Sequence, residues 1–407
     1  MLSMDSPPPG LRPKPAITTG PACRLCGARL HRTLIDLGSI PLASGLDDRP
    51  YPLHVRMCDS CALVQIAENL PPELATTPAR RTLACQTKAK HHAETMRRRL
   101  CLSTESLVIQ IGNTDRNLLK PYQSAGIPVL GIAPAPNAGI PIEAATFSTG
   151  TAMEIAVRHG CADLVIADNV LPLVPDLFDF VAGLASILRP NGMAILQVPY
   201  LLSLVEATQF DAFSHDIYTY LTLRVLEHAL RAVGLRLFDA ERLPTDGGQL
   251  RVQACHTVGP HPARPGLKAV RLAERFAELD RRDFYSGFSE RVSIRRTEIH
   301  DFLTTRRAAG RRVCAYGATP RGVTLLNCCG ITTEEITCVA DPDPARLGRV
   351  LPGSRIPIVS HEVLVTDPPD DIIILPWQNA SEIALDVTPL RQRGTQLWTL
   401  IPRITRV

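Results

Sequence analysis

The chain has 407 residues and a formal net charge of +4, with 45% hydrophobic and 21% charged residues, which is typical of a globular protein with more than one domain. Its basic residues are scattered, and no apolar run has the length of a membrane span. The composition therefore argues against nucleic-acid and membrane partners, and the lack of a signal-peptide pattern predicts a cytoplasmic protein.

Residues 1–21 are rich in proline and poor in apolar side chains. Such a segment cannot bury enough apolar surface to offset the entropy of ordering it. We therefore expect a disordered tail.

Four of the twelve cysteines form two pairs with two intervening residues each: Cys23 with Cys26, and Cys58 with Cys61. Two such pairs can close a tetrahedral four-thiolate site around Zn²⁺, which leaves no open coordination position. The spacing predicts one structural zinc ion, with four unrelated buried cysteines as the alternative. The other eight cysteines are expected to be small, buried apolar side chains.

The middle of the chain begins like a nucleotide-binding α/β unit. An apolar strand over residues 107–111 runs into Gly112, and an apolar-periodic helix and a second strand follow. This helix is expected at 118–125 and this second strand at 127–132. Further strands are expected at 162–167 and 193–198, with a helix within 174–188 and a turn at 190–192.

The last third of the chain predicts a second parallel sheet. A long charged helical region at 269–307 precedes it as a bridge, and strands are expected at 312–315, 336–340, 371–375 and 396–401. Gly317, followed by Pro320-Arg321-Gly322, places a glycine turn at a helix N-terminus, which suits an anionic phosphate. The alternative is an ordinary connection between a strand and a helix.

Several motifs together resemble sugar C-methyltransferases, which methylate nucleotide-linked deoxy-ketosugars in antibiotic biosynthesis. These motifs are CRLC, DLGSIPLA, YPLHVRMCDSCALVQ, NLPPEL, VPYL, DGGQLRV, YGATPRGVTLLNCCGI, GRVLPGSRIPI and ILPWQN. The resemblance implies an α/β protein of three parts: a Cys₄ zinc-binding domain (22–75), a class I S-adenosylmethionine (SAM) methyltransferase Rossmann domain (76–265), and a C-terminal Rossmann-like substrate-binding domain (311–407) after a helical bridge (266–310).

The stretch that matches the family's catalytic Tyr-His-Glu-His run departs from it. Ser214 stands in place of the tyrosine, and Ile217, which cannot accept a proton, stands in place of the basic histidine. Leu173 stands where the family has a further histidine. The candidate catalytic residues that remain are His215, Asp216, Tyr218 and Tyr220. We expect His215 on a loop that contributes little to core packing, and the alternative is a set of polar side chains beside a vestigial pocket.

The cofactor site that the resemblance implies is also altered. Ala133 stands where the family has an acidic ribose ligand, Arg116 replaces a glycine, and the 76–86 segment, which closes over SAM in the family, has no aromatic residue. The sequence therefore predicts that SAM binds weakly or not at all. The candidate cofactor-binding residues are Gln110, Gly112, Asp115 and Asn169.

The candidate substrate-binding residues are Asp246, Arg251, Gly317 and Arg321. Three functions remain open: methyl transfer from SAM to a nucleotide-linked sugar or related small molecule, a SAM-independent step such as isomerisation or cyclisation, and non-catalytic binding to another enzyme of the same pathway.

Overall fold

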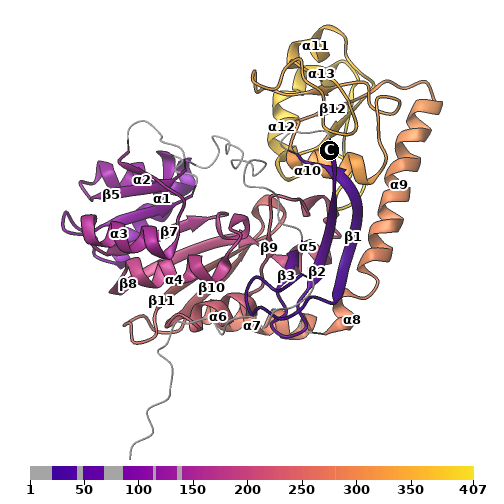
Figure 1. Cartoon of the computed structure of the whole chain (residues 1–407). Coiled ribbons are helices and arrows are strands. Elements are labelled where there is room, and N and C mark those ends of the chain that lie inside the picture. Colours follow the sequence, from indigo (N-terminus) through magenta and orange to yellow (C-terminus); the bar gives the residue numbers. More distant parts are fainter. Residues whose placement is uncertain (1–20, 44–48, 68–85, 113–115, 135–139, 280) are drawn as a thin grey trace, which may run out of the picture.

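The computed structural model describes residues 21–43, 49–67, 86–112, 116–134, 140–279 and 281–407. The predicted tail up to residue 20, residues 76–85 of the segment expected to close over SAM, and Asp115 lie outside these ranges. Figure 1 shows the central domain in magenta and the C-terminal domain in yellow, with helix α9 (Phe288–Ala308) running beside strand β1 (Arg32–Pro41).

The N-terminal domain contains an antiparallel sheet in the order β1-β2-β3-β9. Strands β2 (Pro50–Met57) and β3 (Val64–Ile66) follow β1 in sequence, whereas β9 (Thr219–Tyr220) comes from the middle of the chain. Alternate residues of β2 are buried, as expected for a sheet with one face against the core. The zinc-binding domain is thus completed by a strand that the sequence assigned to the SAM-like domain.

The central sheet has seven strands in the order β6-β5-β4-β7-β8-β11-β10. Every neighbouring pair is parallel except the two pairs that β11 makes. This is the arrangement of class I methyltransferases, and it confirms the predicted fold. The strands are β4 (Val108–Ile111), β5 (Val129–Ala133), β6 (Ile142–Ala144), β7 (Ala162–Asp168), β8 (Leu188–Pro199), β10 (Leu235–Leu243) and β11 (Gln249–His256).

Helices cover both faces of this sheet because its central strands are apolar on both sides. Val108 and Leu164 belong to one hydrophobic cluster with helices α1 and α2, whereas Ile109 and Val165 belong to another with α3 and α4. The helices of this domain are α1 (Gln86–Arg99), α2 (Arg116–Ser124), α3 (Thr149–His159), α4 (Leu177–Ile187), α5 (Leu201–Glu206) and α6 (Leu223–Arg231), with short 3₁₀ turns η3 (Leu171–Leu173), η4 (Phe210–Ala212) and η5 (Thr245–Gly247).

The predicted turn at residues 190–192 is wrong. Strand β8 runs through it, and its register with β7 skips from Ala162–Leu188 to Leu164–Met193. The turn-forming residues are therefore accommodated as an irregularity within the strand, where Gly192 lies too close to the Ala162 carbonyl for a side chain to fit.

The predicted helical bridge is divided into α7 (Pro265–Ala277), α8 (Arg282–Tyr285) and α9. Helix α7 ends where Glu278 adopts a left-handed conformation with φ of 54°. Earlier in α7, the carboxylate of Glu274 accepts hydrogen bonds from the amides of Leu223 and Arg224 at the start of α6 and from the Tyr200 hydroxyl. The bridge is therefore also packed firmly onto the central domain.

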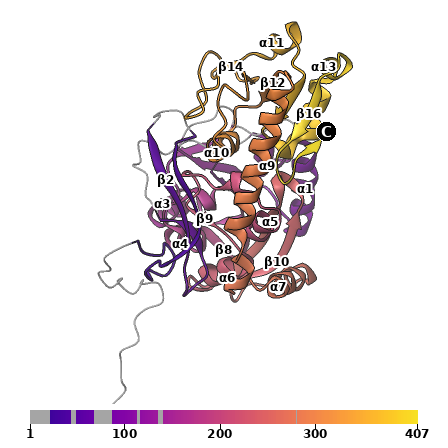
Figure 2. The same cartoon turned by 90° about the vertical axis from the view of Figure 1, so that its right-hand side faces the viewer.

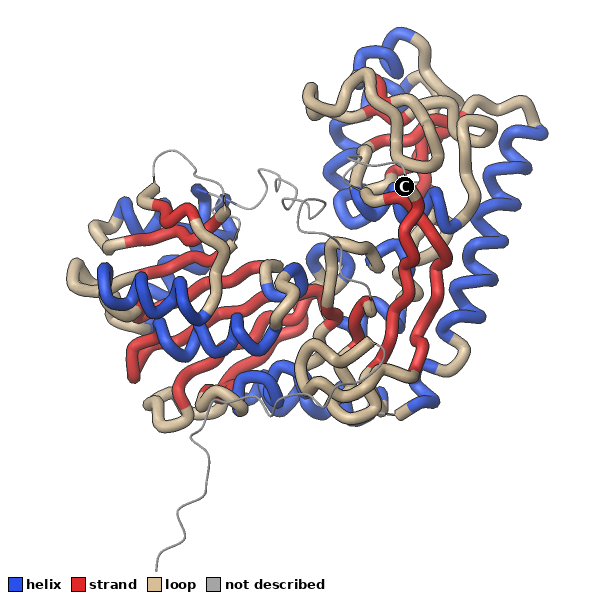
Figure 3. The backbone as a smooth tube through the Cα atoms, in the orientation of Figure 1, coloured by secondary structure: helices blue, strands red, loops and turns tan. Residues whose placement is uncertain are grey.

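The C-terminal domain contains the second parallel sheet, in the order β14-β13-β12-β15-β16-β17, with only the β16–β17 pair antiparallel. Figure 3 shows its strands in red with helices on both sides. The elements are β12 (Val313–Tyr316), α10 (Pro320–Cys328), β13 (Val339–Ala340), β14 (Ile358–Val359), α11 (His361–Thr366), β15 (Asp371–Ile374), η6 (Trp377–Asn379), α12 (Ala380–Asp386), α13 (Thr388–Gln392), β16 (Gln396–Thr399) and β17 (Thr405–Arg406).

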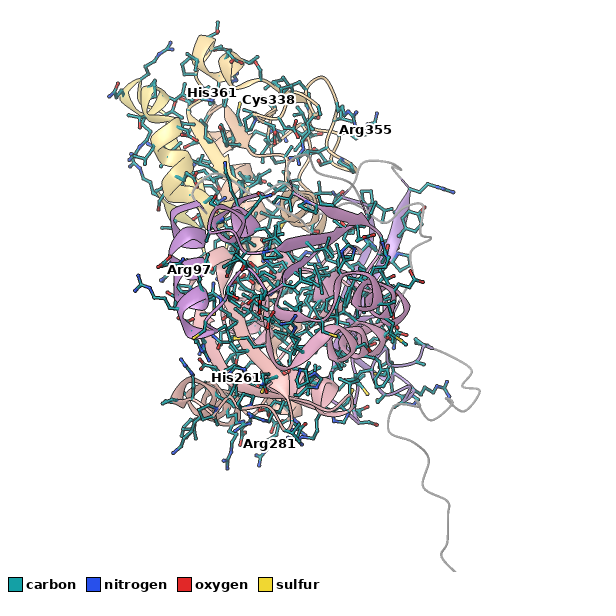
Figure 4. All side chains as sticks on the ribbon, turned by 90° about the vertical axis from the view of Figure 1, so that its left-hand side faces the viewer. Arg97, His261, Arg281, Cys338, Arg355 and His361 are labelled. Atoms are coloured by element: carbon teal, nitrogen blue, oxygen red, sulfur yellow. The ribbon has the colours of Figure 1, made fainter. Side chains whose placement is uncertain are left out.

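Most of the other described cysteines are buried, as predicted, but Cys101 is exposed and Cys161 is half-buried. The thiols of Cys314 and Cys338 lie 3.3 Å apart in the C-terminal domain, where Figure 4 labels Cys338. None of the helices in the described part of the chain combines the length and apolarity that crossing a membrane requires.

Candidate functional site

The four predicted zinc ligands come together in the N-terminal domain. The Sγ atoms of Cys23, Cys26, Cys58 and Cys61 all lie within 4.8 Å of one another. A tetrahedral zinc site with Zn–S bonds of about 2.3 Å has S–S edges of about 3.8 Å, so this cluster has the size and donor set that Zn²⁺ requires. The Cys₄ zinc site is confirmed, and its closed donor set gives the metal a structural role.

The thiols in this cluster strongly affect one another's protonation. Hydrogen bonds from Cys58 and Cys61 lower the pKa of Cys23 to about 2, and the bond with Cys23 raises the pKa of Cys58 to about 12. Four thiolates this close together are stable only when a cation compensates their charge. The cluster is therefore suited to bind a metal ion, which displaces the protons that the thiols otherwise hold.

The predicted cofactor-binding residues lie at the carboxyl edge of the central sheet. Gly112 follows β4 with φ of +92°, and a Cβ atom there would lie 2.9 Å from the side chain of Val170, so only glycine fits. Asn169 follows the neighbouring strand β7, and buried Gln110 belongs to β4 itself. Because the chain order reverses between β4 and β7, this edge is where ligands bind in open α/β sheets.

This edge of the sheet offers a hydrogen-bond acceptor to a hydroxyl or ammonium group of SAM but no carboxylate to its ribose. The Oδ1 atom of Asn169 is buried with no hydrogen-bond partner among the described residues, so it is an acceptor suited to a hydroxyl or ammonium group of a ligand. By contrast, Ala133 ends the adjacent strand β5 as a buried apolar residue and offers no carboxylate to the ribose hydroxyls. The residues present therefore fit a SAM-type ligand in backbone geometry but lack the usual ribose anchor.

Three of the four predicted catalytic side chains are buried between the zinc-binding and central domains. The Nε2 atom of His215 lies 3.1 Å from the carbonyl oxygens of both Tyr51 and Pro52 at the start of β2. Carbonyls only accept hydrogen bonds, so Nε2 carries the proton and donates it. His215 lies in a turn between η4 and β9, as expected, but the expected small role in packing is wrong, because its side chain is only 3% exposed.

Tyr218 and Tyr220 are also packed in this region. The guanidinium of Arg24, in the first zinc knuckle, lies 4.6 Å from the centre of the Tyr218 ring. The Tyr220 hydroxyl accepts a hydrogen bond from the Ser214 amide, and burial raises the pKa of Tyr220 well above its usual value. Asp216, in contrast, is half-buried. The catalytic roles of these four residues stay a prediction.

Arg321 lies in the first turn of α10, where its side chain faces the central domain. Its Nη1 atom lies 3.4 Å from Oε1 of Gln209 and 3.4 Å from Oδ2 of Asp211. The same Asp211 oxygen accepts a 2.9 Å hydrogen bond from the Trp377 indole, while its other oxygen, Oδ1, is buried with no hydrogen-bond partner among the described residues. This interdomain cluster of Gln209, Asp211, Arg321 and Trp377 joins the two Rossmann-like domains.

The other predicted substrate-binding residues surround this cluster or lie on the nearby sheet. Gly317 turns at the end of β12 with φ of +88°, and a Cβ there would lie 2.6 Å from Pro376, the residue before Trp377. Asp246 is exposed and lies in η5 next to Gly247, which approaches both Gln209 and Trp377. Arg251 binds Gln197 on β8 through two of its nitrogen atoms, at 3.2 and 2.9 Å.

Sequence reasoning missed three members of the interdomain cluster: Gln209, Asp211 and Trp377. Asp211 and Trp377 are 166 residues apart in sequence, so no local spacing could have paired them. Trp377 lies in the ILPWQN motif, where the tryptophan was the only available signal, and Asp211 lies three residues before Ser214.

Two family models match this chain. Residues 244–402 match the model described as "C-methyltransferase C-terminal domain", and residues 23–75 match the one described as "Putative zinc binding domain". The chain is 29% identical over 399 residues to C-methyltransferase NovU of Streptomyces niveus, and the match covers 93% of this chain and 95% of that protein.

Among solved structures, the chain is similar to a SAM-dependent methyltransferase of Clostridium acetobutylicum, with a TM-score of 0.35 and 8% identity over 42% of this chain and 92% of that one. It is also similar to 1,6-didemethyltoxoflavin-N1-methyltransferase of Burkholderia thailandensis, with a TM-score of 0.33 and 14% identity over 48% of this chain and 96% of that one.

Proposed function

Because this chain belongs to the sugar C-methyltransferase family, we propose that it transfers a methyl group from SAM to a carbon atom of a nucleotide-linked sugar or related small molecule in natural-product biosynthesis. The observation that carries the proposal is the carboxyl edge of the central sheet, where Gly112 and Asn169 follow neighbouring strands at the reversal of strand order, and where Oδ1 of Asn169 has no hydrogen-bond partner among the described residues.

When bound, SAM supplies an electrophilic methyl group. Oδ1 of Asn169 would accept a hydrogen bond from the bound cofactor, and the backbone at Gly112 would leave room for it. Since Ala133 provides no acceptor for the ribose, the affinity for SAM is expected to be low.

The substrate's anionic part is assigned to Arg321. Its hydrogen bonds to Gln209 and Asp211 both use Nη1, whereas a guanidinium has five N–H donors, so Arg321 can also bind a phosphate oxygen. Oδ1 of Asp211, which has no hydrogen-bond partner in the part of the chain that the structure describes, can accept a hydrogen bond from a sugar hydroxyl or amine that enters the junction.

Carbon methylation next to a ketone needs a base to remove the proton. His215 is assigned this role through Nδ1, because Nε2 donates to the carbonyls of Tyr51 and Pro52. Asp216 is assigned to orient the imidazole or to bind a substrate hydroxyl.

A second candidate function, a SAM-independent step or a non-catalytic partnership with another pathway enzyme, is favoured by the packing of the same segment. His215 and Tyr220 are almost fully buried, and they contact the zinc-binding domain at the Tyr51 carbonyl and at Val64 of β3. Side chains that stabilise a domain junction keep this role in a protein that has lost its catalytic activity.

A transfer assay with trideuteromethyl-labelled SAM distinguishes the two candidates. The protein is incubated with nucleotide-linked deoxy-ketosugars, and the products are analysed by mass spectrometry. Methyl transfer predicts a product heavier by the labelled methyl group, with the label on carbon by NMR. Unlabelled but isomerised substrate, or no change with any ketosugar at high SAM concentration, would favour the second candidate.

A further inference from the structure

Residues 214–221, called here the junction segment, lie between the zinc-binding and central domains. On one side, β9 in this segment pairs with β3 of the zinc-binding domain, with Val64 opposite Tyr220 and Gln65 opposite Thr219. On the other side, the Tyr218 amide donates to the Pro172 carbonyl of the central domain at 2.8 Å. Figure 1 shows β9 near β3, at the lower end of the hairpin formed by β1 and β2.

Gln65 contacts both the zinc centre and the junction segment. Its side chain is fully buried, and its Nε2 atom donates to the Sγ of Cys23 at 3.2 Å while its Oε1 accepts from the Arg24 amide at 2.8 Å. Its backbone lies opposite Thr219 in the β3–β9 pair. An amide that donates to a zinc-bound thiolate orients that ligand and is held in place by it.

Arg24 makes a second connection of the same kind. It lies between the ligands Cys23 and Cys26, so the metal fixes its backbone. Its guanidinium covers the ring of Tyr218 at 4.6 Å, and its Nη1 donates to the Pro175 carbonyl of the central domain at 3.1 Å. A further contact joins the two parts directly, because the Ile66 amide donates to the Tyr218 carbonyl at 3.1 Å.

We propose that Gln65 and Arg24 couple the zinc centre to the junction segment, so that the metal sets the position of His215, Tyr218 and Tyr220 as well as the fold of its own knuckles. The inference does not depend on methyl transfer, since it concerns where these side chains are held. In the competing account, the central domain alone orders the segment through the Tyr218–Pro172 bond and the internal bond from the Ser214 amide to Tyr220.

The test compares Gln65→Leu with native protein, both carrying their metal. Thr33→Val is the matched control, because it removes a hydrogen bond with His54 between β1 and β2 in the same domain without touching a zinc ligand. Three properties are measured: zinc content, the absorption spectrum after cobalt substitution, and amide hydrogen exchange across residues 214–221.

The proposal predicts that Gln65→Leu keeps about one equivalent of zinc and shifts the cobalt–thiolate absorption bands. Exchange of the junction-segment amides should become about tenfold faster or more, as expected for losing a hydrogen bond to a charged group. Thr33→Val should change neither the spectrum nor this exchange. If Gln65→Leu does not fold, Gln65→Glu serves instead, because it keeps the acceptor for Arg24 and removes the donor to Cys23.

A second pair of variants tests the other connection. Arg24→Gln should accelerate exchange at the junction segment with an unchanged cobalt spectrum, whereas Arg29→Gln, which alters an exposed arginine near the same knuckle, should affect neither. A shifted cobalt spectrum with native exchange in Gln65→Leu, or native exchange in Arg24→Gln, would overturn the coupling. The segment would then be held by the central domain and by its contacts with β2 and β3, independently of the zinc centre.

Discussion

The indole Nε1 of Trp377 donates a 2.9 Å hydrogen bond to Oδ2 of Asp211, which joins the C-terminal domain to a buried carboxylate of the central domain. The other tryptophan of the chain, Trp398, makes the same kind of bond to buried Asp371, but within the C-terminal domain. The two bonds are chemically alike and differ in whether they cross the domain junction. Figure 2 shows the C-terminal domain above the central domain, with helix α9 running between them.

We expect Trp377→Phe to weaken the domain junction. The substitution keeps the aromatic ring but removes a hydrogen bond to a charged group, which stabilises a protein by about 1.5–3 kcal/mol. Differential scanning calorimetry should show the unfolding of the C-terminal domain separating from that of the central domain. Trp398→Phe is the control, since it should lower the midpoint of the C-terminal domain without this separation. A single native-like transition in Trp377→Phe would contradict the role assigned to the bond.

Removal of one zinc ligand should release the metal. Cys58→Ser leaves three thiols, which bind Zn²⁺ less tightly, and the domain loses the folding free energy that the metal supplies. Metal analysis should return about one equivalent of zinc for native protein and much less for the variant, with a lower thermal midpoint. Cys101→Ser, at an exposed cysteine outside the cluster, should change neither value. A metal-free native protein of equal stability would refute the site.

The roles of His215 and Asp216 can be separated because the structure places them differently. Asp216→Asn changes a half-buried side chain and should reduce turnover by about two orders of magnitude, the usual contribution of general acid–base help, with little loss of stability. His215→Ala should reduce turnover similarly but also lower the thermal midpoint, since its ring donates to the Tyr51 and Pro52 carbonyls. Full activity in both variants would identify these residues as purely structural.

Glu274 gives stability a particular pH dependence. Burial raises the pKa of this carboxyl above its unfolded value of about 4.5. A carboxyl with a raised folded pKa stabilises the fold at pH below the unfolded pKa, and this contribution is lost as the pH rises through the folded pKa. The free energy of unfolding of native protein relative to Glu274→Gln, measured by urea denaturation, should therefore fall as the pH rises from about 4.5. A difference that grows with pH would contradict the assignment.

The parts of this protein that depend on local sequence were predictable. The spacing of Cys23, Cys26, Cys58 and Cys61 gave the zinc site because both knuckles are local, and the apolar runs of β4 and β7 gave the central sheet because buried parallel strands need them. In both cases the residue types that the structure requires, closely spaced thiols or a run of apolar side chains, lie within a few neighbouring positions.

The contacts that join the domains were not predictable in this way. Nothing near Thr219 indicates that it pairs with Gln65, and nothing near Glu274 indicates that it caps a helix beginning at Leu223. The buried state of His215 likewise depends on carbonyls more than 160 residues earlier in the chain. These arrangements result from tertiary packing, which the local pattern of one sequence does not contain.

Calorimetric titration with SAM and S-adenosylhomocysteine tests the central claim most directly. Native protein should bind both ligands more weakly than the low micromolar range, about −8 kcal/mol, because Ala133 offers the ribose no acceptor. Ala133→Asp should tighten binding, whereas the control Ala125→Asp, at an exposed residue after α2, should not. No binding by native protein and no gain in Ala133→Asp would contradict a SAM site at this edge and leave the SAM-independent function as the better account.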